Sequence, residues 1–486
     1  MARARPVVNF GGNIAFVPAA IERPRSADEV LDVLRRNAKQ RVRCIGAGHS
    51  WNRILATDGV LLDLGALDSV EVVAAENLVR VGAGCTLERL LGTLRTAGYT
   101  LPTLGAVTMQ TVAGAISTGT HGTGRESLSH FVVEAKVATL DPTTGEAGVT
   151  RFREGEALRA ARCALGALGV IVELALRIEP AYRVEERVEC VDSLEAVLEG
   201  RDDWPLQQFA LLPWCWRYVV FRRRRSERPG GGLRARVLRW LNFLGTDVLL
   251  HVVLRLVLGW AGVFGEGAIR AFYRRVLPHV ILKYRDRVDD SQTILTMRHD
   301  LFPHVEMELF VPEDRLPEAV AAIRQLVELA GEGATRIDRL SGLEPALIDA
   351  VWKLRGSYTL HYPLFFRRVL PDDTLVSMTS AADRPVRAWI SISFFTYRAP
   401  REDFARFAET VARCMTALVG ARVHWGKYLP LAPEQAAGGY RDFAKFAAIC
   451  ARHDPHGRFG YFDMAAAAAR PAPATGQATH TSWQPS

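Results

Sequence analysis

Several signatures that would assign this chain of 486 residues quickly are missing from it. Its seven cysteines include no C-x-x-C pair and lie mostly among apolar neighbours. This pattern predicts reduced, buried thiols, and no metal site is predicted. No uninterrupted apolar run reaches the 18 or so residues that a membrane-spanning helix needs. The first residues, MARARPVVNFGGN, lack an apolar core of signal-peptide length, so we expect a cytoplasmic protein.

The two common nucleotide-binding glycine motifs are also absent. There is no G-x-x-x-x-G-K-[ST] loop, and the loop that begins at Gly46 like a dinucleotide fingerprint has Trp51 where the third glycine belongs. That loop, Gly46-Ala47-Gly48-His49-Ser50-Trp51-Asn52, follows the apolar pair Cys44-Ile45, which indicates the end of a strand. Its bare amides suit a pyrophosphate. The alternative is a strand-ending turn with an exposed histidine.

Two further stretches accompany this loop. Residues 101–124, LPTLGAVTMQTVAGAISTGTHGTG, are rich in small residues and contain no charged side chain before His121. Such a stretch lets backbone approach a large flat ligand, although it would also suit a buried turn packed on strands. Near the other end of the chain, Arg422-Val423-His424-Trp425-Gly426-Lys427 places a lysine after a glycine and an aromatic residue.

In this order, the three stretches resemble the flavoproteins of the vanillyl-alcohol-oxidase (PCMH) type, and more narrowly the sugar-1,4-lactone and alditol oxidase family. The resemblance covers residues 24–178 and 376–464. It implies bound FAD, linked covalently through His49. The residues that the resemblance assigns to the cofactor are Gly46, Ala47, Gly48, His49, Ser50, Trp51, Asn52, Gly105, Ala106, Thr111, Gly114, Thr118, His121, Gly122, Gly169 and Ile171.

The chain length exceeds one ordinary core, and strands mixed with helices at short spacing predict an α+β fold. We expect a two-subdomain FAD-binding domain over residues 1–180, then an antiparallel-sheet cap domain for the substrate over 181–415 with a basic apolar insertion at 217–287. Residues 416–464 would return to the first domain, and 465–486 would form a disordered tail. Strands are predicted at 41–45, 60–64, 78–81, 131–140, 167–174, 209–212, 218–221, 304–312 and 389–397, and helices after Ser26, after Thr86, at 316–329 and at 404–418.

The positive charge is concentrated in one segment. The chain has a formal net charge of +8, whereas residues 217–287 alone hold 16 basic and 4 acidic side chains, which gives +12. The segment joins Arg222–Arg225 to a long apolar stretch, Leu233–Gly265. This combination is typical of a segment that contacts an anionic membrane surface from the cytoplasmic side. A packed helix pair is the alternative, and the apolar surroundings of the arginines argue against nucleic acid as a partner.

The resemblance also implies a chemistry, in which an alcohol carbon delivers hydride to flavin N5 while its hydroxyl loses a proton. Lys427 is predicted to stabilise the charge of the reduced flavin or to contact the substrate oxygen, unless it is a surface lysine. His424 is the first candidate for the proton acceptor, although it could simply pack beside Trp425. Arg367 and Thr396 match residues that bind the substrate in alditol oxidases.

At the same motifs the chain departs from those relatives. The glutamate and histidine that bind the polyol are Phe365 and Phe394 here, which predicts a drier pocket. The expected substrate is therefore a sugar lactone or a more apolar, even lipid-linked, alcohol rather than a simple polyol. Gly105 or Ala106 aligns with an oxygen gate, which favours an oxidase that reduces O2 to H2O2, unless Gly105 is only a turn residue. A flavin dehydrogenase or reductase with a quinone or protein acceptor, and a non-catalytic binding protein, remain the alternatives.

Overall fold

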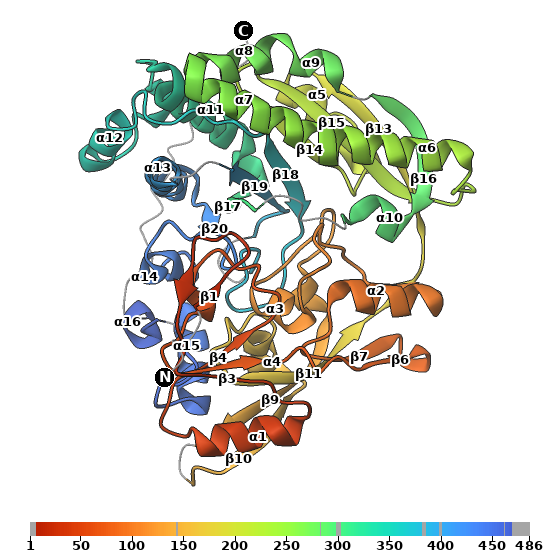
Figure 1. Cartoon of the computed structure of the whole chain (residues 1–486), viewed down its shortest axis with the longest axis vertical. Helices are drawn as coiled ribbons and strands as arrows, with labels where there is room; N and C mark the ends of the chain where they lie inside the picture. Colours follow the sequence, from red (N-terminus) through yellow and green to blue (C-terminus); the bar gives the residue numbers. More distant parts are fainter. Residues whose placement is uncertain are drawn as a thin grey trace.

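The chain divides into a lower half that holds both ends of the described chain and an upper half built from its middle (Figure 1). The structure is a computed structural model that describes residues 6–141, 144–281, 283–297, 303–381, 385–397, 401–460 and 462–468. Loops from both halves meet between them.

The lower half contains a parallel and an antiparallel sheet. The parallel sheet has the order β3-β5-β4, and the antiparallel sheet has the order β10-β9-β11-β7-β6. Two short pairs, β1-β2 and β12-β8, lie beside them. The strands are β1 (Val7–Val8), β2 (Ala15–Phe16), β3 (Ala20–Glu22), β4 (Val42–Ile45), β5 (Val60–Asp63), β6 (Val70–Val73), β7 (Leu78–Gly82), β8 (Tyr99–Thr100), β9 (Val132–Leu140), β10 (Ala147–Phe152), β11 (Val170–Arg177) and β12 (Glu179–Pro180).

Local sequence sets the helix starts in this half. Ser26 caps α1 (Ala27–Arg36) by accepting a hydrogen bond from the Glu29 amide, and Glu29 itself accepts from the Arg25 amide at 2.7 Å. This is a capping box shifted by one residue, because the reciprocal bond goes to the residue before the cap. Thr86 caps α2 (Leu87–Thr96) by accepting a hydrogen bond from the Arg89 amide, without a reciprocal bond. The remaining helices here are α3 (Val112–Ser117), α4 (Gly155–Ala161), α14 (Pro433–Ala437), α15 (Phe443–His453) and α16 (Met464–Ala468).

The upper half is an eight-stranded sheet with the order β16-β13-β15-β14-β18-β19-β17-β20. All of its pairings are antiparallel. The strands are β13 (Arg183–Val191), β14 (Gln208–Leu212), β15 (Arg217–Ser226), β16 (Tyr284–Asp290), β17 (Val305–Pro312), β18 (Leu364–Val369), β19 (Trp389–Thr396) and β20 (Arg422–Val423). Because β20 pairs with β17, the chain still belongs to this sheet at residue 423 before it returns to the lower half.

Helices cover one face of this sheet. On β17 the side chains of Val305, Met307 and Leu309 belong to a buried apolar cluster shared with α11 (Leu316–Glu332) and α13 (Glu402–Val419). Side chains alternate along a strand, so Glu306 and Glu308 lie on the opposite face, toward the lower half. The other helices of this half are α5 (Leu194–Leu198), α8 (Gly267–Arg275), α9 (Leu277–Val280), α10 (Ser291–Leu295) and α12 (Pro345–Trp352). Short 3-10 turns occur in both halves: η1 (Arg53–Leu55), η2 (Ala74–Glu76), η3 (Leu128–Phe131), η4 (Arg201–Asp203), η6 (Glu313–Arg315) and η7 (Asp338–Leu340).

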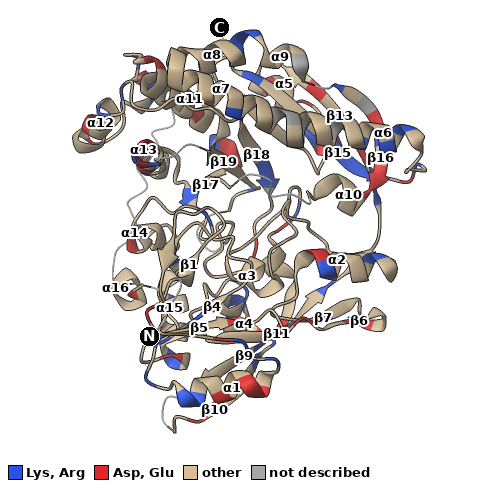
Figure 2. Cartoon of the chain, in the orientation of Figure 1, with Lys and Arg blue, Asp and Glu red and all other residues tan. Residues whose placement is uncertain are grey.

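The long apolar stretch predicted from the sequence forms one unbroken helical segment. It runs through α6 (Leu233–Asn242), a π-helical part, η5 (Phe243–Leu249), and α7 (Leu250–Phe264). It lies across the upper half, where Figure 2 shows α7 almost without charge. None of the described helices combines the length and the apolar character needed to cross a membrane.

The four consecutive arginines are not a free basic patch. Residues 222–225 belong to β15, and each guanidinium pairs with a glutamate: Arg222 with Glu189, Arg223 with Glu186, Arg224 with Glu185 and Arg225 with Glu179. The first three partners lie on the neighbouring strand β13. These ion pairs offset the charge of the run within the domain, and the expectation that it contacts a membrane stays a prediction. The predicted tail needs correction at its start, since residues 465–468 are helical in α16, and residues 469–486 lie outside the described residues.

Glu186 is the most buried carboxylate of this ladder, with a side chain 2% exposed that binds Arg223, Arg287 and Tyr284. Burial alone would raise the pKa of Glu186, but the two arginines outweigh it and the pKa is lowered.

We expect Glu186→Gln to lower the free energy of unfolding by about 3–5 kcal/mol, because the change leaves a buried arginine without its counter-ion. A carboxyl with a depressed pKa stabilises the fold above its unfolded pKa, about 4.3, and loses that contribution as the pH falls. The gap between wild type and variant should therefore shrink on acidification, as measured by denaturant titration at several pH values. The exposed Glu195→Gln is the control, and an equal loss in both variants at neutral pH would contradict the prediction.

Candidate active site

The three stretches selected from the sequence meet at one place, between the two halves. The Trp51 amide donates to the Gly426 carbonyl at 3.1 Å, and the Asn52 side chain donates to the Trp425 carbonyl. Gly426 in turn packs on Thr118, whose Oγ1 would lie 2.9 Å from an added Cβ. The backbone of His424 and Tyr428 also bonds to β17, at Glu308 and Glu306. Segments that lie 373 positions apart in sequence are thus held together at this cavity.

Most of the predicted cofactor residues line this cavity. They are Gly46, Ala47, Gly48, His49, Ser50, Trp51, Gly105, Ala106, Thr111, Gly114, Thr118, His121, Gly169 and Ile171. Two others do not: Asn52 faces the backbone of Trp425, and Gly122 lines a small adjoining cavity. A further glycine turn, Gly82-Ala83-Gly84 at the end of β7, contributes Ala83 and Gly84 to the lining.

Glycine is required where this wall is tightest. An added Cβ at Gly46 would overlap the hydroxyl of Thr111, so the first and second stretches touch only because Gly46 has no side chain. Gly48 has a φ of +69°, in the left-handed region that favours glycine, and it turns the chain so that His49 follows it into the cavity. The His49 ring stacks on Phe10, with a centroid distance of 4.8 Å.

The upper sheet supplies the opposite wall. Alternate residues of its central strands reach the cavity: Gln208 from β14, Phe365 and Arg367 from β18, Phe395 from β19, and Glu306 and Glu308 from β17. The two glutamates and Gln208 were missed from sequence. A signal existed in the V-E-M-E-L pattern of β17, which puts two carboxylates on one face of a strand.

Lys427 is brought to this wall. Its Nζ forms an ion pair with Glu306 and lies 4.7 Å from the centre of the Trp51 ring, which gives a cation–π contact. Its side chain is 18% exposed, so it is not a surface lysine. Arg367 lines both the main and the adjoining cavity, and within the described part of the chain its guanidinium forms no ion pair.

Thr396 and Phe394 lie on the other face of β19. They pair in register with Val305 and Met307, both are fully buried, and Phe394 packs on Phe407 of α13. The alignment that put Thr396 in contact with substrate and Phe394 in the pocket is therefore one residue out of register, because a shift of one residue exchanges the two faces of a strand. Phe395 and Tyr397 line the cavity in their place.

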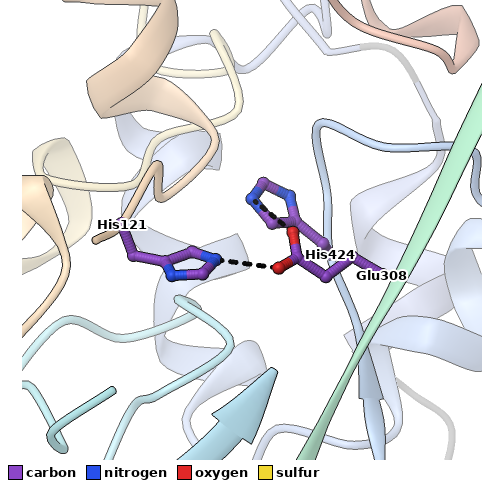
Figure 3. Close-up of side chains that lie close together, drawn as sticks. All are labelled: His121, Glu308 and His424. Carbon is purple, nitrogen blue, oxygen red and sulfur yellow. Dashed lines mark hydrogen bonds and ion pairs between the residues drawn. The ribbon is translucent and has the colours of Figure 1, made fainter. Parts of the chain in front are cut away.

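His121, Glu308 and His424 form a buried cluster in which both histidines face the carboxylate (Figure 3). His121 Nε2 is 3.2 Å from Glu308 Oε1, and its Nδ1 is 3.0 Å from the Gly122 carbonyl. His424 Nε2 is 3.9 Å from Glu308 Oε2. Although burial would raise the pKa of Glu308, the charges of His121 and Lys427 outweigh it, and the pKa is held well below its usual range.

The protonation of His424 argues against its acting as the catalytic base and against its acting as a metal ligand. Its Nδ1 accepts a hydrogen bond from the Gly426 amide at 2.9 Å, so the proton of the neutral ring is on Nε2, toward Glu308. Burial lowers the pKa of His424 to about 3. The ring therefore offers no lone pair to an alcohol proton, which disfavours the predicted role as base. For the same reason Nε2 cannot ligate a metal, and the cluster is better described as an ionic network.

Aromatic rings form the remainder of the upper wall. Tyr362 lies 5.1 Å from Phe395 and 5.2 Å from Tyr397, and Phe365 lies 6.1 Å from both Tyr362 and Phe395, measured between ring centres. His304 lies beside Phe395 at 5.4 Å. His251, from α7, is 3.1 Å from the Tyr397 hydroxyl. The cavity thus combines a charged part on β17 with an apolar, aromatic part beside α7.

Comparisons with known proteins agree with this geometry. Residues 18–147 match a family model described as FAD binding domain, and residues 174–465 match D-arabinono-1,4-lactone oxidase. A long-chain alcohol oxidase from an uncultured marine euryarchaeote is 40% identical over 94% of this chain and 96% of its own length. An L-gulono-1,4-lactone dehydrogenase from Mycobacterium tuberculosis is 27% identical over 92% and 95%. The fold is similar to that of cholesterol oxidase from B. sterolicum, with a TM-score of 0.71, 14% identity and coverage of 95% and 96%.

The fold and the cavity define an FAD-dependent oxidoreductase with a PCMH-type cofactor domain and an antiparallel-sheet domain. The chain belongs to the D-arabinono-1,4-lactone oxidase family, which confirms the resemblance drawn from its motifs. The residues present fit FAD: bare glycine amides follow β4, and the wall of small residues at 105–118 allows a close approach.

Proposed function

We propose that this protein oxidises the hydroxyl of an apolar, chain-like alcohol at its FAD. The observation that supports the proposal is the aromatic wall formed by Tyr362, Phe365, Phe395 and Tyr397. Its two tyrosine hydroxyls already lie within hydrogen-bond distance of His251, so the wall offers few partners for several substrate hydroxyl groups. The long-chain alcohol oxidase relative supports the same substrate class. A sugar lactone is the second candidate, supported by the lactone-oxidising relatives.

The free energies of binding favour the apolar alcohol over a polyol. Each hydroxyl left unpaired in an apolar site costs about 1–3 kcal/mol, so a polyol with several free hydroxyls would bind poorly against this wall. Each methylene that is buried contributes about 0.8 kcal/mol. A linear chain therefore gains from the same surface that penalises a polyol.

The charged part of the cavity would accept the proton that the alcohol hydroxyl loses. FAD supplies, when bound, the acceptor for the hydride from the alcohol carbon. Glu306 reaches the cavity as a carboxylate and would take the hydroxyl proton, since His424 has no lone pair for it. Lys427 would keep Glu306 oriented and place a positive charge beside the reaction. Arg367, without a carboxylate partner among the described residues, would hold the substrate oxygen.

The chain-length dependence of the reaction tests this proposal. We expect linear primary alcohols to bleach the bound flavin under anaerobic conditions, with kcat/KM rising about fourfold per methylene, as 0.8 kcal/mol of burial implies. Phe365→Glu should abolish the gain, because it places a charge in the apolar wall, whereas Phe365→Leu should keep most of it. Faster bleaching by xylitol or a gulono-lactone than by any linear alcohol would overturn the proposal.

A covalent bond between His49 and FAD is also proposed, since His49 follows the tight turn at Gly48 and lines the cavity. Purified protein should keep its yellow colour in the pellet after acid precipitation, and His49→Ala should release it to the supernatant. His49→Ala should still bind FAD, because the surrounding glycine amides are unchanged. Colour that leaves the wild type on precipitation would disprove the bond without touching FAD binding.

We propose O2 as the electron acceptor, with Gly105 at its path to the cofactor. A Cβ at Gly105 would lie 2.9 Å from Thr120 Cγ2, so Gly105→Ala alone forces Thr120 to shift. The double variant Gly105→Ala/Thr120→Ser removes that methyl group and isolates the effect on the path. In stopped-flow experiments it should reoxidise severalfold more slowly in air than Thr120→Ser, with unchanged flavin reduction. Slow reoxidation of the wild type would instead favour a quinone or protein acceptor.

We also propose that the protein makes a peripheral contact with an anionic membrane at the cytoplasmic face. The pairing of Arg222–Arg225 removes their charge from such a surface. The contact would instead be made by the helical segment 233–264, whose outer face carries exposed apolar side chains.

A further inference from the structure

The outer face of the helical segment 233–264 is unusually apolar for a surface exposed to water. On α7, Trp260 is 62%, Val263 77% and Phe264 76% exposed, and on α6 Trp240 is 60% exposed. Leu233, Val237, Leu241, Val252 and Leu256 are exposed on the same segment. Single apolar side chains on a surface are ordinary, but a group gathered on one helical segment indicates an interaction site.

The inner face of α7 is apolar as well. Leu254, Val257 and Ala261 are buried against the upper half, while Val252, Leu256, Trp260 and Val263 recur at helical spacing on the outside. An α-helix that is apolar all round is normally enclosed by protein or by lipid. Within the described chain, protein covers only one of the two faces.

Charge around this face identifies the partner. Residues 233–275 contain seven arginines and two acidic residues; Arg239 pairs with Asp289, and Arg270 and Arg274 both pair with Glu332, so an excess of three positive charges is left when these two carboxylates are counted. Arg236 on α6 and Arg275 on α8 are exposed, and neither forms an ion pair with another described residue. Exposed tryptophans flanked by arginines suit the interface of an anionic lipid bilayer, where the indole sits at headgroup level. A protein partner would need no such excess of one charge.

The same helix reaches the substrate cavity from its inner side. His251, one turn before Leu254, lines the cavity. Its Nε2 lies 3.1 Å from the Tyr397 hydroxyl and 3.4 Å from that of Tyr362. A helix is about 10 Å across, so the aromatic part of the cavity lies only one helix thickness from the exposed apolar face.

We propose that the segment 233–264 docks the protein on an anionic lipid surface and that the alcohol passes from that surface along α7 into the cavity beside His251. The delivery step rests on the proposed oxidation of an apolar alcohol, whereas docking does not. The apolar tail would then stay next to the helix that meets the lipid, with its hydroxyl toward β17.

The test compares Trp260→Ser/Phe264→Ser with Trp352→Ser, a change of a 37% exposed tryptophan on α12. Vesicles of phosphatidylcholine with phosphatidylglycerol are sedimented with each protein, and FAD absorbance and melting temperature confirm folding. We expect the wild type and Trp352→Ser to bind, less so at high salt, and the double variant to bind at least about tenfold more weakly. Equal binding by all three proteins would overturn docking.

Delivery is tested with hexadecanol dissolved in the vesicles and octanol dissolved in water. The double variant should lose most activity on hexadecanol, with octanol oxidation unchanged. Weakened vesicle binding with full hexadecanol activity would overturn delivery. A wild-type dimer that the double variant dissociates, seen by size-exclusion chromatography, would show that a second copy covers this face and would overturn docking. If the wild type oxidises no alcohol, the proposed function fails, and vesicle binding still decides docking.

Discussion

Strand register in the upper sheet is the constraint on which the site depends. Along β17, β18 and β19, one set of alternating side chains, which includes Met307, Phe366 and Phe394, packs in the apolar cluster under α11 and α13. The intervening set, which includes Glu306, Arg367 and Phe395, faces the cofactor cavity. A slip of one residue would bury carboxylates under the helices and turn apolar rings to the cavity. Packing of the helices therefore fixes the chemistry of the opposite face.

This register places two buried carboxylates in the cavity wall, and residues outside β17 supply the groups that compensate their charge. Glu306 and Glu308 are two residues apart on a strand whose every residue is buried, and two uncompensated carboxylates there would be costly. Lys427 neutralises Glu306, and His121 faces Glu308 from the loop after α3. The lysine comes from the stretch at residues 422–427 and the histidine from the stretch at residues 101–124, so two segments far apart in sequence supply the groups that face the carboxylates of β17.

Local patterns were enough to predict the parts of the site that are continuous in sequence. The glycine turn before His49, the cap at Ser26 and the position of Lys427 follow from neighbouring residues and from the family resemblance. Non-local pairings were not accessible in the same way. Lys427 and Glu306 are 121 positions apart, and the glutamates that neutralise Arg223 and Arg224 belong to another strand. The register of Phe394 and Phe395 failed for a similar reason, since three consecutive apolar or β-forming residues at the end of a strand carry no period-two signal.

The distribution of polar groups within the cavity implies a direction for the substrate. The carboxylates of Glu306 and Glu308 lie on β17 with Lys427 beside Glu306, and Arg367 enters from β18, whereas rings gather where β18 and β19 approach α7. An alcohol with one hydroxyl and a long apolar tail has the same asymmetry, so only one orientation avoids both an unpaired hydroxyl and a solvated chain. A molecule with hydroxyls along its whole length cannot satisfy both parts at once. If the proposed alcohol is the substrate, the cavity would select by the position of polar groups along the molecule as well as by their number, and the alcohol's tail would point toward His251 and the helix whose other face is exposed and apolar.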